Sequence, residues 1–495
     1  MEDNSRIKHS GQIFTPQFIV DKMLDFCGYV GNCILKKHVI DNSCGDGAFL
    51  CSIVARYCNV SLNANCKKDI LANELETFIH GIELDNVTYN NCIDNLNHIT
   101  EAYGLRRIKW DIRNTNTLKV YDFNNRMDYV IGNPPYVRVH NLGDSYEAVK
   151  SYIFASDGMT DLYLVFFEIG FKMLNDTGKL CYITPSSWLN SVAANTFRRY
   201  ITMTKKLCGL IDLEHFQAFE NAMTYTIISL FDNSKHDNFL NYYKYNESEQ
   251  DKDFICTLTF DEIDINGDFY LSDKEDLELL RNIKSCHYPE YTVAKNGFAT
   301  LADKVFVGDF PFKEMTIPVI KGSTGKWRYC FYPYDKKGKP FDKETIFANT
   351  EIANYLNIHK KELLKGKTEK QKPNWFLFGR TQALKDVYTN KISINTVIKD
   401  ISTVKINDVP SGSGVYSGIY ILSKIPYEKI KSIILTDEFI HYISCLKKYK
   451  SGGYYTYSTK DIQQYINYKL YSDDSKDNKL SNGKRRFPER YLEIF

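Results

Sequence analysis

The residues of this chain best suited to chemistry form the run Asn133-Pro134-Pro135-Tyr136. The carboxamide oxygen of Asn133 can accept a hydrogen bond from an amino group. The two prolines fix φ, so they stiffen the turn and hold the neighbouring main-chain carbonyls in one direction. The Tyr136 ring offers a flat face for stacking. The run therefore suits a planar molecule that carries an NH2 group, although an ordinary proline turn after a strand would also explain these four residues taken alone.

A second candidate site is a glycine-rich turn that begins at Asp41, directly after the apolar pair Val39-Ile40. Gly45 and Gly47 allow a tight bend and the close approach of a ligand to the backbone. A dinucleotide site would need a third glycine, where this chain has Leu50, and a phosphate would meet the carboxylate of Asp41. We therefore expect a ligand with a cationic centre, such as S-adenosylmethionine.

Two further carboxylates are predicted at strand ends. Glu83 closes a predicted strand at residues 78–83, where a carboxylate can accept hydrogen bonds from ribose hydroxyls. Asp111 stands at the end of a third predicted strand, residues 108–112, where it can accept a hydrogen bond from an adenine amine while Ile112 packs on the ring. Each acid alone is more often a helix cap or a solvated strand end. Three of them at successive strand ends, after a glycine loop, predict a nucleoside site.

Strands and helices must alternate to position these groups, and the first 240 residues show that alternation. We predict helices near residues 48–56, after Asp85 and at 161–174, and seven strands at 39–40, 78–83, 108–112, 129–132, 180–183, 207–213 and 225–231. This alternation indicates a doubly wound α/β sheet, in which ligands lie beyond the carboxyl ends of the strands. We place this first domain at residues 1–240 and a second, mixed α+β domain at residues 241–495.

The composition excludes several classes of protein. The sequence contains no run of 18 or more apolar residues, so we expect no membrane span. Its charged start lacks the apolar core of a signal peptide. Thirteen cysteines without a Cys-x-x-Cys pair indicate reduced thiols in a cytosol, and neither they nor the ten dispersed histidines imply a metal. We therefore expect a cytosolic protein that holds no metal; its placement in the bacterial cytoplasm, associated with the nucleoid, is what the family resemblance described below implies.

The net charge of +2 hides a segregation along the chain. Residues 321–495 hold 32 Lys and Arg against 18 Asp and Glu, residues 241–320 hold 8 against 16, and residues 1–240 hold 23 against 27. A basic last third suggests a polyanionic partner, although lysine-rich surfaces are common. Basic and aromatic residues interleave at 321–339 and 370–385, a mixture that suits nucleic acid, while most of these aromatics individually are expected in the core.

The order of the motifs resembles that of the γ-class, TaqI-type DNA adenine-N6 methyltransferases. The resemblance covers about residues 10–232 and is weaker at 379–382 and 454–458, which look similar to pieces of target-recognition domains. It depends on these motifs in this order: Gln12-Ile-Phe-Thr-Pro16, the Asp41–Leu50 loop, Glu83, Asp111 and Asn133-Pro-Pro-Tyr136.

The resemblance implies a Rossmann-like, mixed seven-stranded methyltransferase sheet and a second, DNA target-recognition domain. It implies a sequence-specific enzyme that flips an adenine out of double-stranded DNA and transfers a methyl group from S-adenosylmethionine to N6, as the modification enzyme of a type II restriction-modification system. Whether a separate cognate endonuclease acts beside it stays open.

Site roles follow from the same resemblance. Asn133 and the main-chain carbonyl of Pro134, stiffened by Pro135, would hold the target amine, and Tyr136 would stack on the flipped base. Phe219 would be the second stacking ring, with Phe216 as a competitor. The expected cofactor residues are Phe14, Thr15, Pro16, Asp41, Cys44, Gly45 and Gly47 around the methionine end, Glu83 at the ribose, Asp111 and Ile112 at the adenine, and Asn133.

Two other functions remain possible from the residues. An RNA or protein-amide methyltransferase can use the same amine-binding run, and a non-catalytic DNA-binding subunit can keep the fold. The length beyond residue 240 and its basic bias argue against a protein-glutamine substrate, and the complete set of pocket residues argues against an inactive subunit. A fused nuclease would need an Asp…Glu-x-Lys constellation, and the sequence shows no convincing one.

Overall fold

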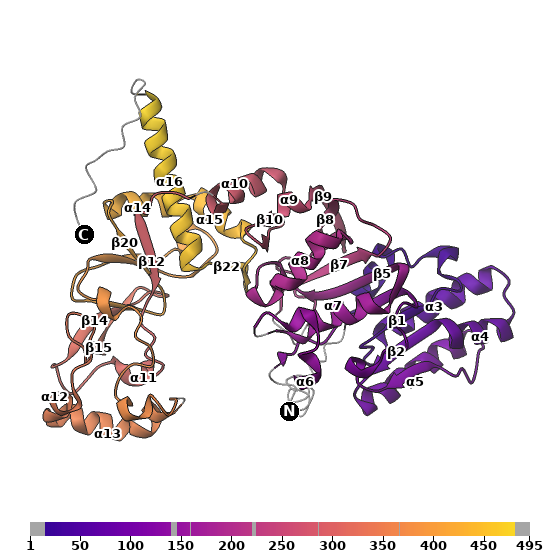
Figure 1. Ribbon diagram of the computed structural model, residues 1–495, viewed down its shortest axis with the longest axis horizontal. Helices are drawn as coiled ribbons and strands as arrows, with labels where there is room; N and C mark the ends of the chain where they lie inside the picture. The colour runs from indigo at the N-terminus through magenta and orange to yellow at the C-terminus, as the bar shows by residue number, and fades with distance from the viewer. Residues whose placement is uncertain are drawn as a thin grey trace. The chain divides into compact units, whose positions relative to one another are not determined.

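The computed structural model describes residues 15–139, 146–158, 160–219, 224–285, 287–365 and 367–480. It divides into two compact units, which we call unit 1 (Met1–Glu278) and unit 2 (Leu279–Phe495) (Figure 1). The predicted site residue Phe14 lies outside the described residues. In the described part of the chain, no helix is both long enough and apolar enough to cross a membrane.

Unit 1 is built on one mixed sheet of nine strands, where we predicted seven. β7 is antiparallel to β5 and β6, β8 is parallel to β6, β9 is antiparallel to β8, and the remaining neighbours are parallel. The strands in their order across the sheet are β3 (Asp111–Asn114), β2 (Ile79–Glu83), β1 (Val39–Asp41), β4 (Met127–Gly132), β5 (Leu174–Pro185), β7 (Thr226–Asp232), β6 (Leu207–Asp212), β8 (Phe239–Asn246) and β9 (Asp251–Thr259).

The predicted domain boundary at residue 240 is wrong, because β8 and β9 extend the sheet of unit 1. Their segment is polar and acidic overall, but Leu240 and Tyr242 are fully buried while Asn241 and Tyr243 are half-buried. This period of two places one row of side chains fully in the core and leaves the other row half-buried. The chain leaves unit 1 only near Glu278.

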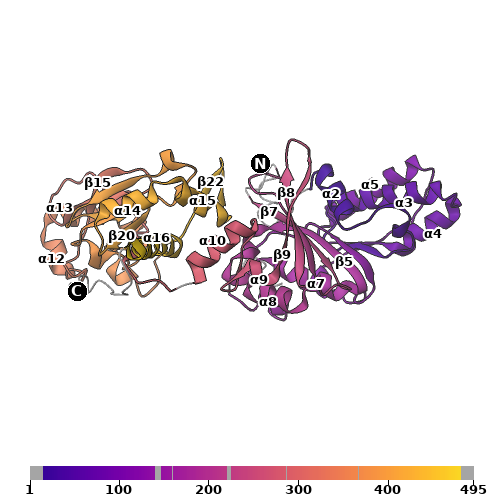
Figure 2. The same ribbon diagram turned by 90° about the horizontal axis from the view of Figure 1, so that it is seen from above.

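Helices cover both faces of this sheet, as the α/β prediction requires (Figure 2). On one face α2, α3, α4 and α5 share a core with β1, β4 and β5. On the other face α7 packs closely on the sheet at Gly170, where a Cβ would lie 2.4 Å from a methyl group of Leu180. The helices of unit 1 are α2 (Gln17–Phe26), α3 (Ala48–Asn63), α4 (Lys68–Phe78), α5 (Asn86–Ala102), α6 (Tyr146–Val149), α7 (Leu162–Met173), α8 (Asn195–Thr204) and α9 (Phe260–Ile263), and α10 (Lys274–Ser285) begins in it.

Unit 2 combines three small sheets with helices. The sheets are β12 (Thr292–Asn296), β20 (Ile419–Ser423), β16 (Lys391–Ile394) and β18 (Ile406–Val409); β13 (Val307–Gly308), β15 (Lys326–Phe331), β14 (Thr316–Lys321) and β19 (Gly414–Tyr416); and β17 (Val397–Ile398), β22 (Tyr454–Thr456) and β21 (Tyr449–Lys450). The helices are α11 (Asp303–Phe306), α12 (Lys343–Ala348), α13 (Thr350–Leu364), α14 (Tyr427–Ile434), α15 (Asp437–Cys445) and α16 (Thr459–Leu480).

Two features stabilise unit 2. An aromatic core includes Phe298, Phe306 and Phe378, whose rings lie 4.9–5.4 Å apart in edge-to-face pairs. A buried ion pair joins the Lys284 ammonium of α10 to the Asp461 carboxylate of α16 at 2.8 Å. Most aromatic residues of this half of the chain are therefore core residues, as expected from the sequence.

Candidate active site

The candidate site lies at the carboxyl ends of β1 and β4, which are neighbours in the sheet. Asp41 ends β1 and Asn133 follows β4, so the two side chains are brought to one edge. Gly132 is needed there, because a Cβ at this position would lie 2.5 Å from Asp41 Oδ1. Ser43, which the sequence did not single out, joins the two: its main-chain N–H donates to Asp41 Oδ1 (3.0 Å) and its hydroxyl donates to the main-chain oxygen of Asn133 (3.2 Å).

The Asn133 carboxamide is oriented by a residue 118 positions earlier in the chain. Its Nδ2 donates to Thr15 Oγ1 at 3.1 Å. Thr15 is buried and precedes Pro16, the N-cap residue of α2, whose main-chain oxygen accepts hydrogen bonds from the first turn of that helix. The start of α2 therefore places Thr15 beside Asn133.

Asp41 is a strongly perturbed group at this edge. It is 1% exposed, and burial raises its pKa from 3.8 to about 8, against a lowering by the Ser43 N–H and with a smaller increase from Glu83. Its Oδ2 is buried and, within the described residues, accepts no hydrogen bond. A buried carboxylate oxygen of this kind is costly unless a cation or donor meets it. The edge therefore fits a ligand with a positive centre.

The glycine loop is fastened to the end of β2. Gly45 and Gly47 both have positive φ (+56° and +94°), which favours glycine. Glu83 Oε2 accepts from the Gly45 N–H (3.0 Å) and Oε1 accepts from the Asp85 N–H (2.8 Å). Cys44 is buried, and its N–H donates to the main-chain oxygen of β2 residue Ile82 (3.0 Å). Glu83 is thus held against the loop that the sequence predicted to bind the ligand.

The prediction that Asp111 lies at a carboxyl strand end is wrong. Asp111 is the first residue of β3 and pairs with His80, whereas Glu83 pairs with Asn114. The Asp111 carboxylate is already engaged, by His80 Nδ1 at 2.7 Å and by Arg113 Nε at 3.1 Å. These partners lower its pKa to about 2.

Two other residues of β3, Ile112 and Asn114, lie closer to the glycine loop and to Glu83 than Asp111 does. Asn114 is the polar side chain beside Glu83, and its Nδ2 donates to the main-chain oxygens of Glu83 and Leu84 (3.0 and 3.1 Å). Ile112 is buried, and its Cδ1 lies 2.9 Å from where a Cβ on Gly81 would be, against the loop side of the sheet. Ile112 therefore remains close to the glycine loop, while Asp111 does not.

Tyr136 is held rigidly by both ends of its side chain. Its hydroxyl donates to the main-chain oxygen of Ile183 on β5 (3.1 Å). Its ring makes edge-to-face contacts with Phe219 (centroids 6.2 Å apart) and with Tyr163 of α7 (6.3 Å). Tyr163 was missed in the sequence because it lies in an apolar helix and reads as a core residue.

The choice between the two candidate phenylalanines follows from these ring contacts. Phe216 packs against Phe18 and Tyr245, with centroids 6.0 and 4.7 Å away, and not against Tyr136. Phe219 is the ring beside Tyr136, at an interplanar angle of 71°. Since these two rings touch edge to face, a base can enter between them only after they separate and turn.

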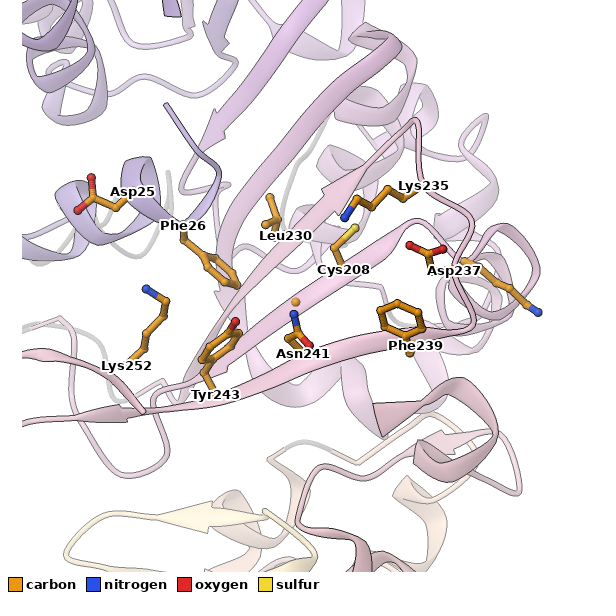
Figure 3. Close-up of a pocket in the computed structure, with 12 residues that line it drawn as sticks. Asp25, Phe26, Cys208, Leu230, Lys235, Asp237, Phe239, Asn241, Tyr243 and Lys252 are labelled. Atoms are coloured by element: carbon orange, nitrogen blue, oxygen red, sulfur yellow. The ribbon is translucent and has the colours of Figure 1, made fainter. Parts of the chain in front are cut away.

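A hollow of unit 1 lies away from this edge of the sheet (Figure 3). It has a volume of about 330 Å3 and opens near the start of β6, at the end of the sheet opposite to Asn133. Its lining mixes aromatic, basic and acidic side chains and includes none of the predicted site residues. The lining residues are Asp25, Phe26, Lys205, Cys208, Gly209, Leu230, Lys235, Asp237, Phe239, Asn241, Tyr243 and Lys252. The carboxyl edge remains the candidate active site.

Comparison with known proteins bears on this site directly. Residues 48–219 match the family model described as Eco57I restriction-modification methylase. We call this matched segment, about a third of the chain, the methylase domain. The predicted resemblance, to the γ-class, TaqI-type DNA adenine-N6 methyltransferases, is confirmed by this likeness to restriction-modification methylases.

The methylase domain has relatives among curated proteins. The chain is 29% identical over 231 residues to the type II methyltransferase M.BstVI of Geobacillus stearothermophilus, which covers 43% of this chain and 40% of that protein. It is 22% identical over 392 residues to the type II restriction enzyme and methyltransferase RM.Eco57I of Escherichia coli, which covers 67% of this chain and 39% of that protein. The matched part is thus about two fifths of the length of either relative.

A solved structure extends the likeness of the fold beyond the methylase domain. The type IIL restriction-modification enzyme MmeI, solved in complex with DNA, superposes with a TM-score of 0.61 at 14% identity, over 90% of this chain and 63% of that chain. At this identity the likeness concerns the fold. Within the methylase domain lie Glu83, the Asn133–Tyr136 run and Phe219, while Thr15 and Asp41 precede the matched segment.

Proposed function

We propose that the chain is a sequence-specific DNA adenine-N6 methyltransferase that uses S-adenosylmethionine, as the modification enzyme of a type II restriction-modification system. The observation that carries the proposal is the pair at the carboxyl edge. The Asn133 carboxamide, an acceptor for an amine, stands beside the buried Asp41 carboxylate, whose Oδ2 accepts no hydrogen bond within the described residues. The methylase domain and its named relatives support the same function.

The residues around Asp41 fit S-adenosylmethionine. Its positive charge would be met by the buried carboxylate, and the two positive-φ glycines let a ligand approach the backbone. When bound, this cofactor supplies a methyl group activated by a sulfonium. We propose that Thr15, Pro16, Asp41, Cys44, Gly45 and Gly47 hold its methionine end, with Phe14 preceding them, and that Glu83 holds its ribose.

The adenine of the cofactor needs a different residue from the one predicted. Ile112 remains a candidate to pack on the ring, because it is buried beside the glycine loop. Asp111 is occupied by His80 and Arg113 at the other end of β3. We propose that Asn114, which lies beside Glu83, takes the place next to the adenine amine.

The target amine would be held by the Asn133–Tyr136 run. The lone pair of an adenine amine is delocalised into the ring, so the nitrogen is a poor nucleophile. Two acceptors, Asn133 Oδ1 and the Pro134 carbonyl, would favour a pyramidal nitrogen and so act mainly on the transition state. Thr15 fixes the plane of the carboxamide and Pro135 fixes the turn, so both contribute orientation.

The adenine must leave the duplex to reach this edge. Extrusion costs a few kcal/mol, and stacking on an aromatic ring contributes about 1–3 kcal/mol per base. Tyr136, anchored through its hydroxyl, would be the fixed ring, and Phe219 would be the ring that moves away to admit the base. Neither step needs a covalent intermediate with the protein.

The test is methylation of DNA in a host without its own methylation. We expect sequencing with modification detection to find N6-methyladenine at a single motif with the wild-type chain and none with Asn133→Ala. The matched control is Asn91→Ala, which removes an exposed carboxamide from α5 and should leave methylation intact.

Other outcomes would contradict the proposal. Unmodified DNA, together with transfer of tritium from labelled S-adenosylmethionine into RNA or protein, would assign the same amine-binding run to a different substrate. Cofactor binding without any transfer, in the presence of DNA, would indicate a non-catalytic DNA-binding subunit.

A further inference from the structure

One exposed strip of unit 2 combines cations and aromatic rings. It is the first part of β15, Lys326-Trp327-Arg328-Tyr329, which we call the β15 strip. All four side chains are exposed, Trp327 to 45% and Tyr329 to 56%, although the strand continues into the fully buried residue Phe331. Large aromatic side chains at a surface are informative when they gather with groups that have their own chemistry.

The one interaction of these four side chains with the described residues is electrostatic: the charge of Arg328 opposes the rise that burial gives the pKa of Tyr416. None of them takes part in a hydrogen bond, an ion pair or a ring contact there, whereas Lys431 in the same unit pairs with both Asp408 and Glu428. Neither packing nor ion pairing within the described chain therefore explains why two aromatics and two cations stand side by side at this surface.

The β15 strip is held rigidly. β15 lies between β14 and β13, and Tyr329 is paired with Pro318 on one side and Gly308 on the other. A Cβ on Gly308 would meet no atom within 4 Å, so the surface beside Tyr329 is open. The tip of the β14–β15 hairpin is fastened to the loop before β20, because a Cβ on Gly322 would lie 2.8 Å from the Cα of Gly418.

A hollow lies over this surface. It has a volume of about 630 Å3 and is lined by Asp309, Pro318, Lys326, Trp327, Arg328 and Tyr329. The strand period of two points Trp327 and Tyr329 to one face and Lys326 and Arg328 to the other. The hollow therefore borders both pairs of residues along the strand, with Asp309 as its single carboxylate.

The charge of the whole unit favours an anionic partner. With the boundary at Glu278, unit 2 holds 37 Lys and Arg against 22 Asp and Glu, a net charge of +15, while unit 1 holds 26 against 39, a net charge of −13. The structural boundary thus sharpens the segregation seen in the sequence. A partner that offers phosphates to cations and flat or apolar edges to aromatics is a nucleic acid.

We propose that the β15 strip contacts double-stranded DNA. Strands of a sheet can contact DNA in its grooves, and β15 presents such a strand in the four-stranded sheet that it forms with β13, β14 and β19. Lys326 and Arg328 bind phosphates or base edges there, and Trp327 and Tyr329 pack on sugars and on thymine methyl groups. This assignment rests on the proposed function and deepens it, because it names the element of unit 2 that binds the substrate.

The test measures binding of the full chain to a fluorescent duplex by anisotropy over a salt series. We expect Arg328→Ala to weaken binding about tenfold and to reduce the slope of log affinity against log salt by about one, the value for one phosphate contact. We expect Trp327→Ala to weaken binding about fivefold or more and to leave that slope unchanged, because the indole carries no charge. Lys361→Ala, which removes an exposed cation from α13, is the matched control and should change neither quantity.

The outcomes separate this inference from the proposed function. Wild-type affinity in both strip variants, with unchanged thermal unfolding, would overturn the inference and leave the proposed function untouched. Weaker binding by the strip variants, with no methyl transfer to DNA by the wild-type chain, would support the strip and contradict the proposed function. Stronger binding of the wild-type chain to an RNA of the same sequence than to the duplex would overturn the choice of DNA.

Discussion

The buried carboxylate of Asp41 makes cofactor binding depend on pH in a way that can be worked out. Its pKa is raised from 3.8 to about 8 in the free protein, so at pH 7 only about one molecule in ten carries the charge. A cationic ligand binds the charged form, so the apparent affinity should be about tenfold weaker at pH 7 and about a hundredfold weaker at pH 6 than well above pH 8. Each pH unit below the pKa costs about 1.4 kcal/mol.

The assay is isothermal titration of the full chain with S-adenosylmethionine between about pH 6 and about pH 9, a range that brackets this pKa. In Asp41→Asn the affinity should be low and nearly independent of pH. Glu83→Gln is the control, because Glu83 lies at the same edge and burial raises its pKa too. If the wild-type affinity is flat over this range, or if Asp41→Asn keeps the slope, the assignment of the cation site to Asp41 is wrong.

The same shift predicts a change of stability in the cofactor-free protein. Between pH 3.8 and about 8 the folded state holds the Asp41 proton that the unfolded state has lost, so this group lowers the free energy of unfolding as pH rises. The loss is about 5 kcal/mol at most by pH 8. Asp41→Asn should therefore lose less stability than the wild type between about pH 5 and about pH 8 in urea unfolding, and equal losses would contradict the burial argument.

Three other substitutions have defined outcomes. Gly132→Ala places a Cβ 2.5 Å from Asp41 Oδ1 and should weaken cofactor binding at least about tenfold in the same titration; unchanged affinity would contradict the close packing. Tyr136→Phe loses the hydroxyl bond to β5 and should cost about 1 kcal/mol of stability while keeping methyl transfer, because the ring that stacks on the base is kept. Loss of methyl transfer in this variant would contradict the stacking role. Asp461→Asn removes the carboxylate that faces the buried Lys284 ammonium and should lower the stability of unit 2 by about 3–5 kcal/mol in urea unfolding, and a loss below about 1 kcal/mol would refute this role.

Local chemistry made part of the site predictable from the sequence. The glycine loop, Asp41 and the Asn133–Tyr136 run each combine a strand pattern with residues that have few alternative explanations. Parallel strands end at one edge, so their joint position follows from the α/β alternation. The structure adds that Asp41 and Asn133 are direct neighbours, because β1 pairs with β4.

Other features depend on register and on distant contacts, which a single sequence does not encode locally. A shift of three residues in β3 moves Asp111 from the carboxyl end to the start of the strand, where His80 and Arg113 bind it. The hydrogen bond between Thr15 and Asn133 spans 118 residues, and the resemblance, not the spacing, brought Thr15 to the site. β8 and β9 were missed because their segment is polar and acidic overall, and the pairing of β8 with β6 assigns them to unit 1.

The new boundary has a consequence for how such a chain can change. Every described residue that we assign to the cofactor or to the transferred group belongs to the stretch that ends at Glu278, and the β15 strip lies wholly beyond it. The residues assigned to the reaction and those assigned to DNA contact therefore lie in separate segments of the chain. Under the proposed assignments, exchange of the second segment alone would change the DNA contacts and leave the residues of the reaction unchanged.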